Sequence, residues 1–216
     1  LVPQLRQGGV QHVKTRELAT PVSKAFVHVQ KGDDYRKAVQ QAHELANEGR
    51  RGPVWLEVPL DAQSDLSRTK SSHDAPGGKD QAEISFPQFV FDETARTLVK
   101  RARRPLIILG AGIRPAPDLD RALEKIDTLG VPIAMSWGAR DLAWRLPSSF
   151  IGSTGVSGNR PANLIADCAD LVVAIGCRLN ATQIGYDPDA FAPEASVLVA
   201  DIDEAEARKL QPREVH

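Results

Sequence analysis

The second half of the chain alternates short, almost wholly apolar runs with amphipathic stretches. The apolar runs, which predict strands, are 105–109, 131–135, 171–175 and 196–202. The amphipathic stretches, which predict helices, are 91–102, 117–129, 161–169 and 204–210. Continuous apolar strands that alternate with helices are typical of a parallel sheet covered on both faces. We therefore predict a Rossmann-like doubly wound α/β domain over residues 86–216, which ends early because little chain follows its last helix.

The first half of the chain has fewer elements. Apolar residues spaced three and four apart predict one amphipathic helix over 33–48, and short apolar runs predict strands at 25–29 and 54–58. One helix and two strands cannot bury their own apolar faces. We therefore expect residues 1–63 to be the C-terminal part of a larger α/β domain. Residues 64–85 are rich in Ser, Asp, Lys and Gly, which indicates a linker between the two domains.

The bulk composition excludes several classes of partner. Lys and Arg number 27 against 28 Asp and Glu, a net charge of −1, so the chain has no basic footprint for nucleic acid or an anionic membrane. No apolar run approaches the roughly 20 residues of a membrane span, and no signal peptide opens the chain. Cys168 and Cys177 are not in a metal-ligand spacing, and each lies in or beside an apolar strand-like run, which indicates two buried free thiols in a cytosolic protein. The five histidines are scattered, so we predict neither a catalytic triad nor a metal site.

A glycine turn follows the first apolar strand of the second half. Gly110, Ala111, Gly112 and Ile113 stand where such a strand gives way to the next helix. In an open α/β sheet this turn lies at the carboxyl edge, where bare N–H groups and a helix start can hold a phosphate. Pro115 stands where a dinucleotide-binding fingerprint has its third glycine, so a tight turn without a ligand is an equally good interpretation.

Three more polar or glycine-rich turns follow at later positions. Gly155 lies in a hydroxyl-rich loop, which suits either a polar ligand or a plain surface loop. Gly176 and Arg178 follow the third strand, and an Arg there can bind a pyrophosphate. Asp201 and Asp203 follow the fourth strand, where doubly wound folds bind a ribose hydroxyl or an adenine edge. Since all these turns face one edge of the predicted sheet, together they indicate a nucleotide-sized crevice.

Two groups of motifs carry a family resemblance. Residues 50–63, with Arg50-Arg51-Gly52-Pro53-Val54 and then Pro59-Leu60-Asp61-Ala62-Gln63, resemble the segment that closes the pyrimidine-binding domain of acetolactate-synthase-like enzymes. Residues 104–105, 110–112, 169–179 and 199–203 resemble the central domain of the same family. The chain is thus similar, over almost its whole length, to thiamine-diphosphate-dependent enzymes of this type.

The resemblance implies an activity for the parent protein rather than for this chain. Such enzymes ligate or cleave carbon–carbon bonds of 2-oxo acids, with thiamine diphosphate as electron sink and Mg²⁺ at its diphosphate. The family's activating Glu is expected upstream of Leu1, and its Gly-Asp-Gly motif downstream of His216. We therefore expect the parent to be an acetolactate-synthase-like lyase or transferase, and this chain to be inactive by itself, with no catalytic residue. Assembly into a homo-oligomer is also implied.

The resemblance further implies a nucleotide in the central domain, which holds FAD in acetolactate synthases. The residues that would line this site are Gly110, Gly112, Ile113, Gly155, Gly176, Arg178, Asp201 and Asp203. The chain departs from the family pattern at Arg178-Leu179-Asn180, where synthases have Arg-Phe-Asp, and at Ser136-Trp137-Gly138-Ala139. FAD, an ADP-like nucleotide and an empty site all remain open.

Two other functions fit parts of the sequence. In the first, the central domain is a scaffold or interface module without a cofactor, which a continuous exposed apolar surface would favour. In the second, the Gly-Ala-Gly-Ile turn at 110–113 belongs to a sirtuin-like NAD enzyme. The absence of paired Cys-x-x-Cys zinc ligands from the sequence argues against the second rival.

Overall fold

The structure is a computed structural model that describes residues 13–64 and 92–208. The chain divides into two compact units, residues 1–85 and 86–216, and each is described by itself. Apart from Ser64, the linker predicted at 64–85 lies outside the described residues.

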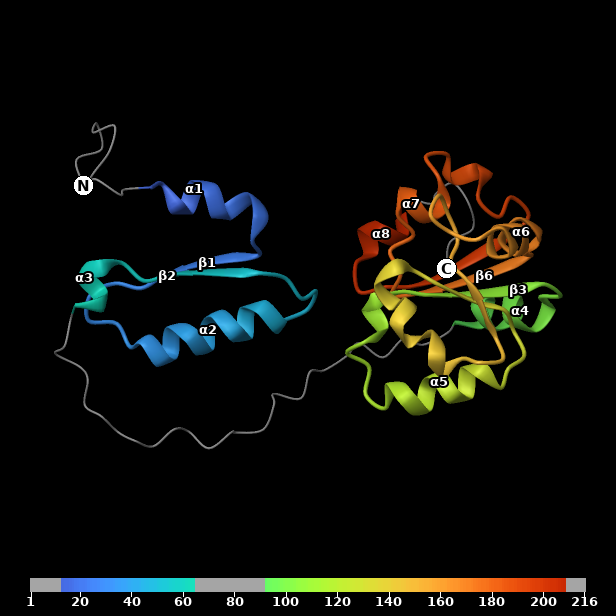
Figure 1. Cartoon of the computed structure of the whole chain (residues 1–216), viewed down its shortest axis with the longest axis horizontal. Coiled ribbons are helices and arrows are strands. Elements are labelled where there is room, and N and C mark those ends of the chain that lie inside the picture. The colour runs from blue at the N-terminus through green and yellow to red at the C-terminus, as the bar shows by residue number, and fades with distance from the viewer. Residues whose placement is uncertain (1–12, 65–91, 209–216) are drawn as a thin grey trace. The chain divides into compact units, whose positions relative to one another are not determined.

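The first unit contains a two-stranded parallel sheet. Its elements are α1 (Thr15–Ala19), η1 (Thr20–Val22), β1 (Ala25–His28), α2 (Tyr35–Asn47), β2 (Val54–Glu57) and α3 (Leu60–Gln63). Helix α2 begins where the Asp34 carboxylate accepts the N–H groups of Arg36 and Lys37. It lies along one face of the β1–β2 pair, and α1 lies along the other (Figure 1). The helix and both strands predicted from the sequence are present.

The first unit buries little apolar surface within the described residues. Val29 and Ala62 are buried, but no residue of α2 is. Trp55 on β2 and Leu60 on α3 are 46% and 79% exposed. A two-stranded sheet of this kind is marginal on its own, because stability needs further strands or a larger apolar layer.

The second unit is built on a five-stranded parallel sheet. Its strands are β3 (Pro105–Leu109), β4 (Ile133–Met135), β5 (Phe150–Gly152), β6 (Leu171–Ile175) and β7 (Ser196–Ala200). Its helices are α4 (Glu93–Arg101), η3 (Ala111–Ile113), α5 (Leu119–Asp127), η4 (Trp137–Arg145), α6 (Arg160–Cys168), α7 (Ala181–Ile184), η5 (Pro188–Ala190) and α8 (Glu204–Arg208). The strand order is β5-β4-β3-β6-β7, with every pair parallel. This confirms the Rossmann-like α/β fold predicted from the alternating pattern.

The strand order reverses direction between β3 and β6. From β3 the chain moves outward through β4 to β5, and from β6 it moves the other way to β7. Loops that leave β3 and β6 therefore diverge to opposite faces of the sheet, which opens a crevice at their carboxyl ends. Ligands of doubly wound folds bind at this reversal point.

Helices cover both faces of the sheet (Figure 1). On one face, Leu123 of α5 and Ala139 of η4 pack with Ile107 and Ile133. Helix α4 covers the same face through Ala95, which packs with Leu171 and Leu198. On the other face, side chains from α6, α7 and the segment after η5 pack with the strands; this cluster includes Leu106, Ile108, Ala166, Val172, Ile184 and Phe191. The strands are almost wholly apolar because both faces of the sheet are covered.

Several predicted boundaries differ from the structure. Strand β4 begins at Ile133, its first residue paired with β3, whereas the predicted start was residue 131. Strand β7 ends at Ala200, two residues before the predicted end at 202. Strand β5 was not predicted, since its three residues give no periodic signal. The nine-residue 3₁₀ segment η4 was not predicted either. Phe91, the expected start of α4, lies outside the described residues.

Candidate functional site: a crevice at the carboxyl edge of the sheet

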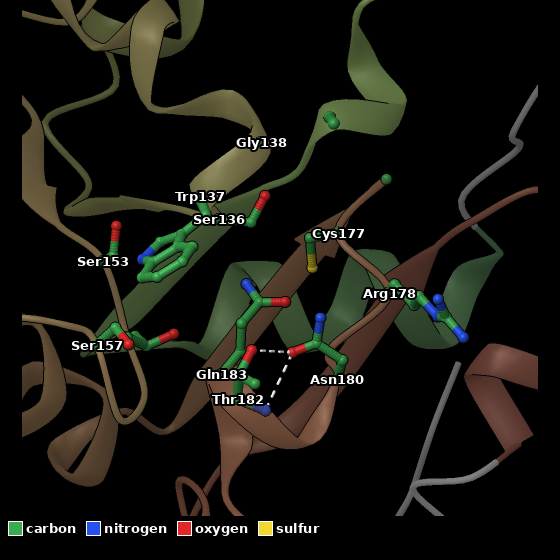
Figure 2. A pocket seen from close by; sticks show the side chains of 13 residues that line it. Ser136, Trp137, Gly138, Ser153, Ser157, Cys177, Arg178, Asn180, Thr182 and Gln183 are labelled. Atoms are coloured by element: carbon green, nitrogen blue, oxygen red, sulfur yellow. Dashed lines mark hydrogen bonds between the residues drawn. The ribbon is translucent and has the colours of Figure 1, made fainter.

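A cavity of about 350 Å³ opens at the reversal point of the second unit (Figure 2). It is lined by residues that follow β3, β4, β5 and β6 in the chain. These are Ala111, Ser136, Trp137, Gly138, Ser153, Thr154, Ser157, Gly176, Cys177, Arg178, Asn180, Thr182 and Gln183. The volume falls within the range of small-molecule sites. The crevice predicted from the polar turns is therefore a real hollow.

The glycine turn after β3 is required by packing. A Cβ on Gly110 would lie closer than 3.0 Å to the Cα of Cys177 and the carbonyl oxygen of Gly176, and a Cβ on Gly112 would lie 2.8 Å from that oxygen. The Gly112 N–H donates to the same carbonyl at 2.9 Å. The turns after β3 and β6 are thus pressed backbone to backbone. Packing alone therefore explains why glycine occupies both positions, and no ligand is needed to account for them.

The hydroxyl-rich loop after β5 is held by two asparagine side chains. Asn159 accepts the N–H of Ser153 at 2.9 Å, and Asn163 accepts the N–H of Gly155 at 2.7 Å. The N–H groups of Val156 and Gly158 donate to backbone carbonyls. These four N–H groups are therefore already paired within the protein and are not available to a phosphate.

The turn after β6 has an unusual backbone. Arg178 and Leu179 have φ angles of +60° and +41°, and Gly176 has +56°. Non-glycine residues in this left-handed region cost of order 1–3 kcal/mol each and persist where the surroundings fix them. The Leu179 side chain is buried in the core, and the Arg178 guanidinium is paired with Glu206 of α8. The strained turn forms one wall of the cavity.

Three polar side chains of the cavity are buried without a partner. Gln183, Ser153 and Thr154 are 7%, 3% and 5% exposed. Both carboxamide atoms of Gln183 and the hydroxyl oxygens of the two others have no hydrogen-bond partner in the described part of the chain. Buried polar groups are nearly always hydrogen-bonded, so unpaired ones mark a place where a ligand or ordered water belongs.

The eight sequence-predicted site residues are only partly brought together. Gly176 and Arg178 line the cavity. Gly110, Gly112, Ile113 and Gly155 adjoin its lining residues, and the Ile113 side chain is buried in the core instead. Asp201 and Asp203, beyond β7, accept N–H groups of their own turn and of α8. Their roles toward a nucleotide stay predictions.

Several lining residues were not predicted as site residues. They are Ala111, Ser136, Trp137, Gly138, Ser153, Thr154, Ser157, Cys177, Asn180, Thr182 and Gln183. Their positions just after apolar strands were the available signal for most of them. Gln183 had no such signal, because its burial arises when α7 approaches the loop at Gly155, and a Cβ on that glycine would lie closer than 3.0 Å to α7.

The lining of the cavity carries few charged side chains. No group of three or more His, Cys, Asp or Glu side chains among them could hold a metal ion. Within the described residues, no helix has the length and apolar character that crossing a membrane requires. Arg178 is the cationic side chain of the cavity lining, and no carboxylate lines it. The lining is therefore mostly neutral and polar, which suits the binding of a polar ligand.

Comparisons with known proteins place this geometry in a family. Residues 93–216 match the family model described as "Thiamine pyrophosphate enzyme, central domain". The acetolactate synthase isozyme 1 large subunit of Escherichia coli is 28% identical over 93% of this chain, and the acetolactate synthase large subunit of Corynebacterium glutamicum is 30% identical over 95%. A probable acetolactate synthase large subunit of Methanococcus aeolicus is 28% identical over 92%. The matched regions are 35%, 32% and 33% of those proteins, so the chain spans about a third of their length. The chain belongs to the thiamine pyrophosphate enzyme family, and its second unit is the central domain of an acetolactate-synthase-like member.

Proposed function

We propose that this chain is part of a thiamine-diphosphate-dependent enzyme that ligates or cleaves carbon–carbon bonds of 2-oxo acids. The observation that carries the proposal is the likeness to acetolactate synthase large subunits over 92–95% of the chain, across both units. The family-model match to the central domain supports it independently. The first unit then corresponds to the end of the pyrimidine-binding domain.

Thiamine diphosphate would supply the electron sink for such a reaction, with Mg²⁺ at its diphosphate. The residues of this chain do not fit either group. The sequence contains no Gly-Asp-Gly, and the described residues hold no metal-ligand cluster. No catalytic step can be assigned to a described side chain, and the contribution of this segment is structural support and ligand binding.

The test of this division of roles is a turnover assay. The purified chain, given pyruvate, thiamine diphosphate and Mg²⁺, should release no CO₂ and form no acetolactate. The same assay on the E. coli relative serves as the positive control. Measurable turnover by this chain would contradict the proposal that it is inactive by itself.

The crevice of the second unit is proposed to bind FAD or an ADP-like nucleotide. Its place at the strand reversal point, its volume of about 350 Å³ and its unpaired polar groups support this. Titration with FAD, followed by flavin fluorescence, should show saturable quenching that ADP reverses. A lack of quenching at any FAD concentration would contradict a flavin nucleotide site.

A scaffold without a bound nucleotide is the second candidate. Three observations favour it: the packing role of Gly110 and Gly112, the occupied N–H groups of the loop after β5, and exposed apolar side chains beside the cavity. The exposed side chains are Trp137 (68%), Val156 (79%) and Tyr186 (94%). This candidate predicts no quenching in the FAD titration together with a tendency to associate.

Assembly and location complete the proposal. Exposed large apolar side chains on the second unit, including Trp144 at 71%, support a homo-oligomer in which they are covered. Light scattering on the purified protein should give a mass of two or four chains. Cys177 is buried as predicted, whereas Cys168 is exposed rather than buried. The sequence has only these two cysteines, and so few cysteines suit a reducing, cytoplasmic location.

A further inference from the structure

The amino edge of the five-stranded sheet carries a second hollow, which the proposed nucleotide site does not use. It has a volume of about 340 Å³ and lies where the turns before β3, β4 and β6 meet. Its apolar lining residues are half-buried, whereas its two arginines are exposed. The lining consists of Arg103, Arg104, Pro105, Gly130, Val131, Pro132, Ile165 and Cys168. The hollow therefore combines an apolar lining with two positive charges at the surface.

The backbone that carries the two arginines is fixed by the protein itself. The Asp170 carboxylate accepts the N–H groups of Arg103 and Arg104, one at each oxygen. The Asp170 N–H donates in return to the Arg104 carbonyl at 3.2 Å. The turn is therefore already ordered, and a partner that binds the arginines does not have to order this backbone.

The side chains of the same arginines keep most of their hydrogen-bonding capacity. Arg104 Nε donates to the Cys168 carbonyl at 2.6 Å, which orients its guanidinium group. The terminal nitrogen atoms of Arg104 and the whole Arg103 guanidinium have no hydrogen-bond or ion-pair partner among the described residues. A guanidinium group carries five donors in a planar fork that matches a carboxylate. Two such groups at one hollow suit a partner with more than one carboxylate.

The charge around the hollow is positive, although the chain as a whole has a net charge of −1. Exposed cations stand at positions 100, 101, 103 and 104, and the carboxylates within two residues of a lining position are those of Asp167 and Asp170. Lys100 and Arg101 end α4, where the helix dipole favours cations without any partner. The two lining arginines follow the helix, and the dipole does not account for them.

An acidic protein segment fits this combination better than a nucleic acid does. Nucleic-acid sites use a row of cations along a phosphate backbone, about 6–10 contacts in well-studied cases, whereas two arginines line this hollow. An apolar lining has no role toward phosphates but can take an aliphatic side chain. Leu129, next to the lining residue Gly130, is exposed and extends the apolar surface. Arginine beside an apolar pocket is a common composition of protein-binding hot spots.

We propose that the amino-edge hollow is a docking surface for an acidic segment of another protein. Carboxylates of that segment pair with Arg103 and Arg104, and an aliphatic side chain between them enters the apolar lining. The proposal goes beyond the proposed function and does not depend on the nucleotide site at the carboxyl edge.

The test uses a blocked peptide, Glu-Glu-Leu-Asp-Glu-Leu, titrated by calorimetry into the whole chain. Two variants of the peptide separate its features: one has Gln and Asn for the acidic residues, and the other has Ser for both leucines. Arg103→Gln removes a charge from the hollow but keeps the backbone N–H that Asp170 accepts, so the fold is retained. Arg121→Gln, at an exposed arginine of α5 outside the lining, is the matched control.

The acidic peptide should bind the wild-type chain saturably, and Arg103→Gln should weaken this binding about 5-fold, because a charge-assisted hydrogen bond is lost. Arg121→Gln should leave the affinity unchanged. The peptide without acidic residues should bind about 10-fold more weakly, and the peptide with Ser about 5-fold more weakly. Raising NaCl from about 50 to about 500 mM should weaken the binding, since the charges are exposed. FAD should not displace the peptide.

Several outcomes would overturn the proposal. The first is a lack of saturable binding of the acidic peptide to the wild-type chain. The second is an equal effect of Arg103→Gln and Arg121→Gln, because the binding would then not involve the hollow. The third is equal affinity for the acidic and the neutral peptide. Displacement of the peptide by oligothymidylate or inorganic phosphate at lower concentration than by unlabelled peptide would assign the arginines to phosphate and overturn it as well.

Discussion

The two edges of the five-stranded sheet are hollowed to nearly the same volume but differ in how their polar groups are used. The hollow at the carboxyl edge has about 350 Å³, and one at the amino edge, lined by residues that include Arg103, Arg104 and Gly130, has about 340 Å³. At the carboxyl edge, buried polar atoms of Gln183 and Ser153 have no partner in the described residues. The difference shows that volume alone does not distinguish a candidate site from a surface hollow.

At the amino edge the protein pairs its own polar groups. The Asp170 carboxylate accepts the N–H groups of Arg103 and Arg104 at 2.8 and 2.9 Å, and the Arg104 guanidinium donates to the Cys168 carbonyl at 2.6 Å. Burial by itself raises the pKa of the Asp170 carboxyl group, but these backbone donors and the charge of Arg104 outweigh it, so the pKa lies below its usual value. This edge ties the turn before β3 to the turn before β6.

The largest expected effect is that of Gly110→Ala at the carboxyl edge. Its Cβ would lie closer than 3.0 Å to the backbone of Gly176 and Cys177, neither of which can move without shifting β6. The free energy of unfolding should fall by about 3 kcal/mol. Gly130→Ala at the amino edge is the control, since its Cβ would meet nothing within 4 Å and only its φ of +67° opposes the change, at about 1 kcal/mol. If urea unfolding shows the same loss of unfolding free energy in both variants, the close approach of the turns after β3 and β6 is contradicted.

Asn159→Ala tests whether the loop after β5 is held by its own side chain. The change removes the acceptor of the Ser153 N–H and the donor to the Ile151 carbonyl. Unfolding free energy should fall by about 2 kcal/mol, since two hydrogen bonds are lost and a partly buried N–H is left unpaired. FAD affinity should fall as well, because Ser153 loses its fixed position. If the variant is as stable as the wild type and binds FAD with the same affinity, the loop after β5 does not contribute to the site.

Asp170→Asn should have a smaller effect and act on stability alone. The variant should lose about 1 kcal/mol at neutral pH, a modest value because the carboxylate is partly exposed to water. Because the pKa in the folded state is lowered, the carboxylate stabilises the fold above the pKa of an unfolded aspartate, about 3.9, and this contribution is lost as the pH falls through the folded pKa. Urea unfolding at descending pH should show wild type and variant converging. A gap that widens on acidification would reverse the assigned sign.

The smallest expected effect is that of Arg178→Met. The Arg178 side chain is 61% exposed and the Glu206 side chain 13%, so water screens this ion pair only in part, and we expect it to contribute less than about 1 kcal/mol. Urea unfolding should therefore hardly change. A loss comparable to that of Gly110→Ala would mean that the strained turn after β6 depends on this ion pair rather than on the buried Leu179.

The sequence predicts the scaffold well because the scaffold is encoded locally. The apolar runs predicted both ends of β3 and β6 correctly. Asp34 and Asp92, a residue type that favours helix N-caps, cap α2 and α4. The predicted carboxyl-edge crevice also exists, because parallel strands bring their ends to one edge.

The lining of the site was less predictable, because it depends on contacts between distant segments. Gln183 is buried through the approach of α7 to Gly155, and β5 is too short to give a pattern. Asp201 and Asp203 lie at the predicted carboxyl edge of the sheet. One carboxylate oxygen of each accepts a backbone N–H group at the start of α8. Position after a strand predicts the edge, and tertiary packing decides which side chains face the cavity.

Hydrogen–deuterium exchange of the chain with and without FAD tests the contrast between the two edges most directly. Saturating FAD should slow exchange in the segments after the strands, 110–113, 136–138, 153–158 and 176–185, and leave 103–105, 130–132 and 168–170 unchanged. Protection centred on the amino-edge segments, or no protection anywhere at saturating FAD, would contradict the assignment of the carboxyl-edge crevice as the ligand site.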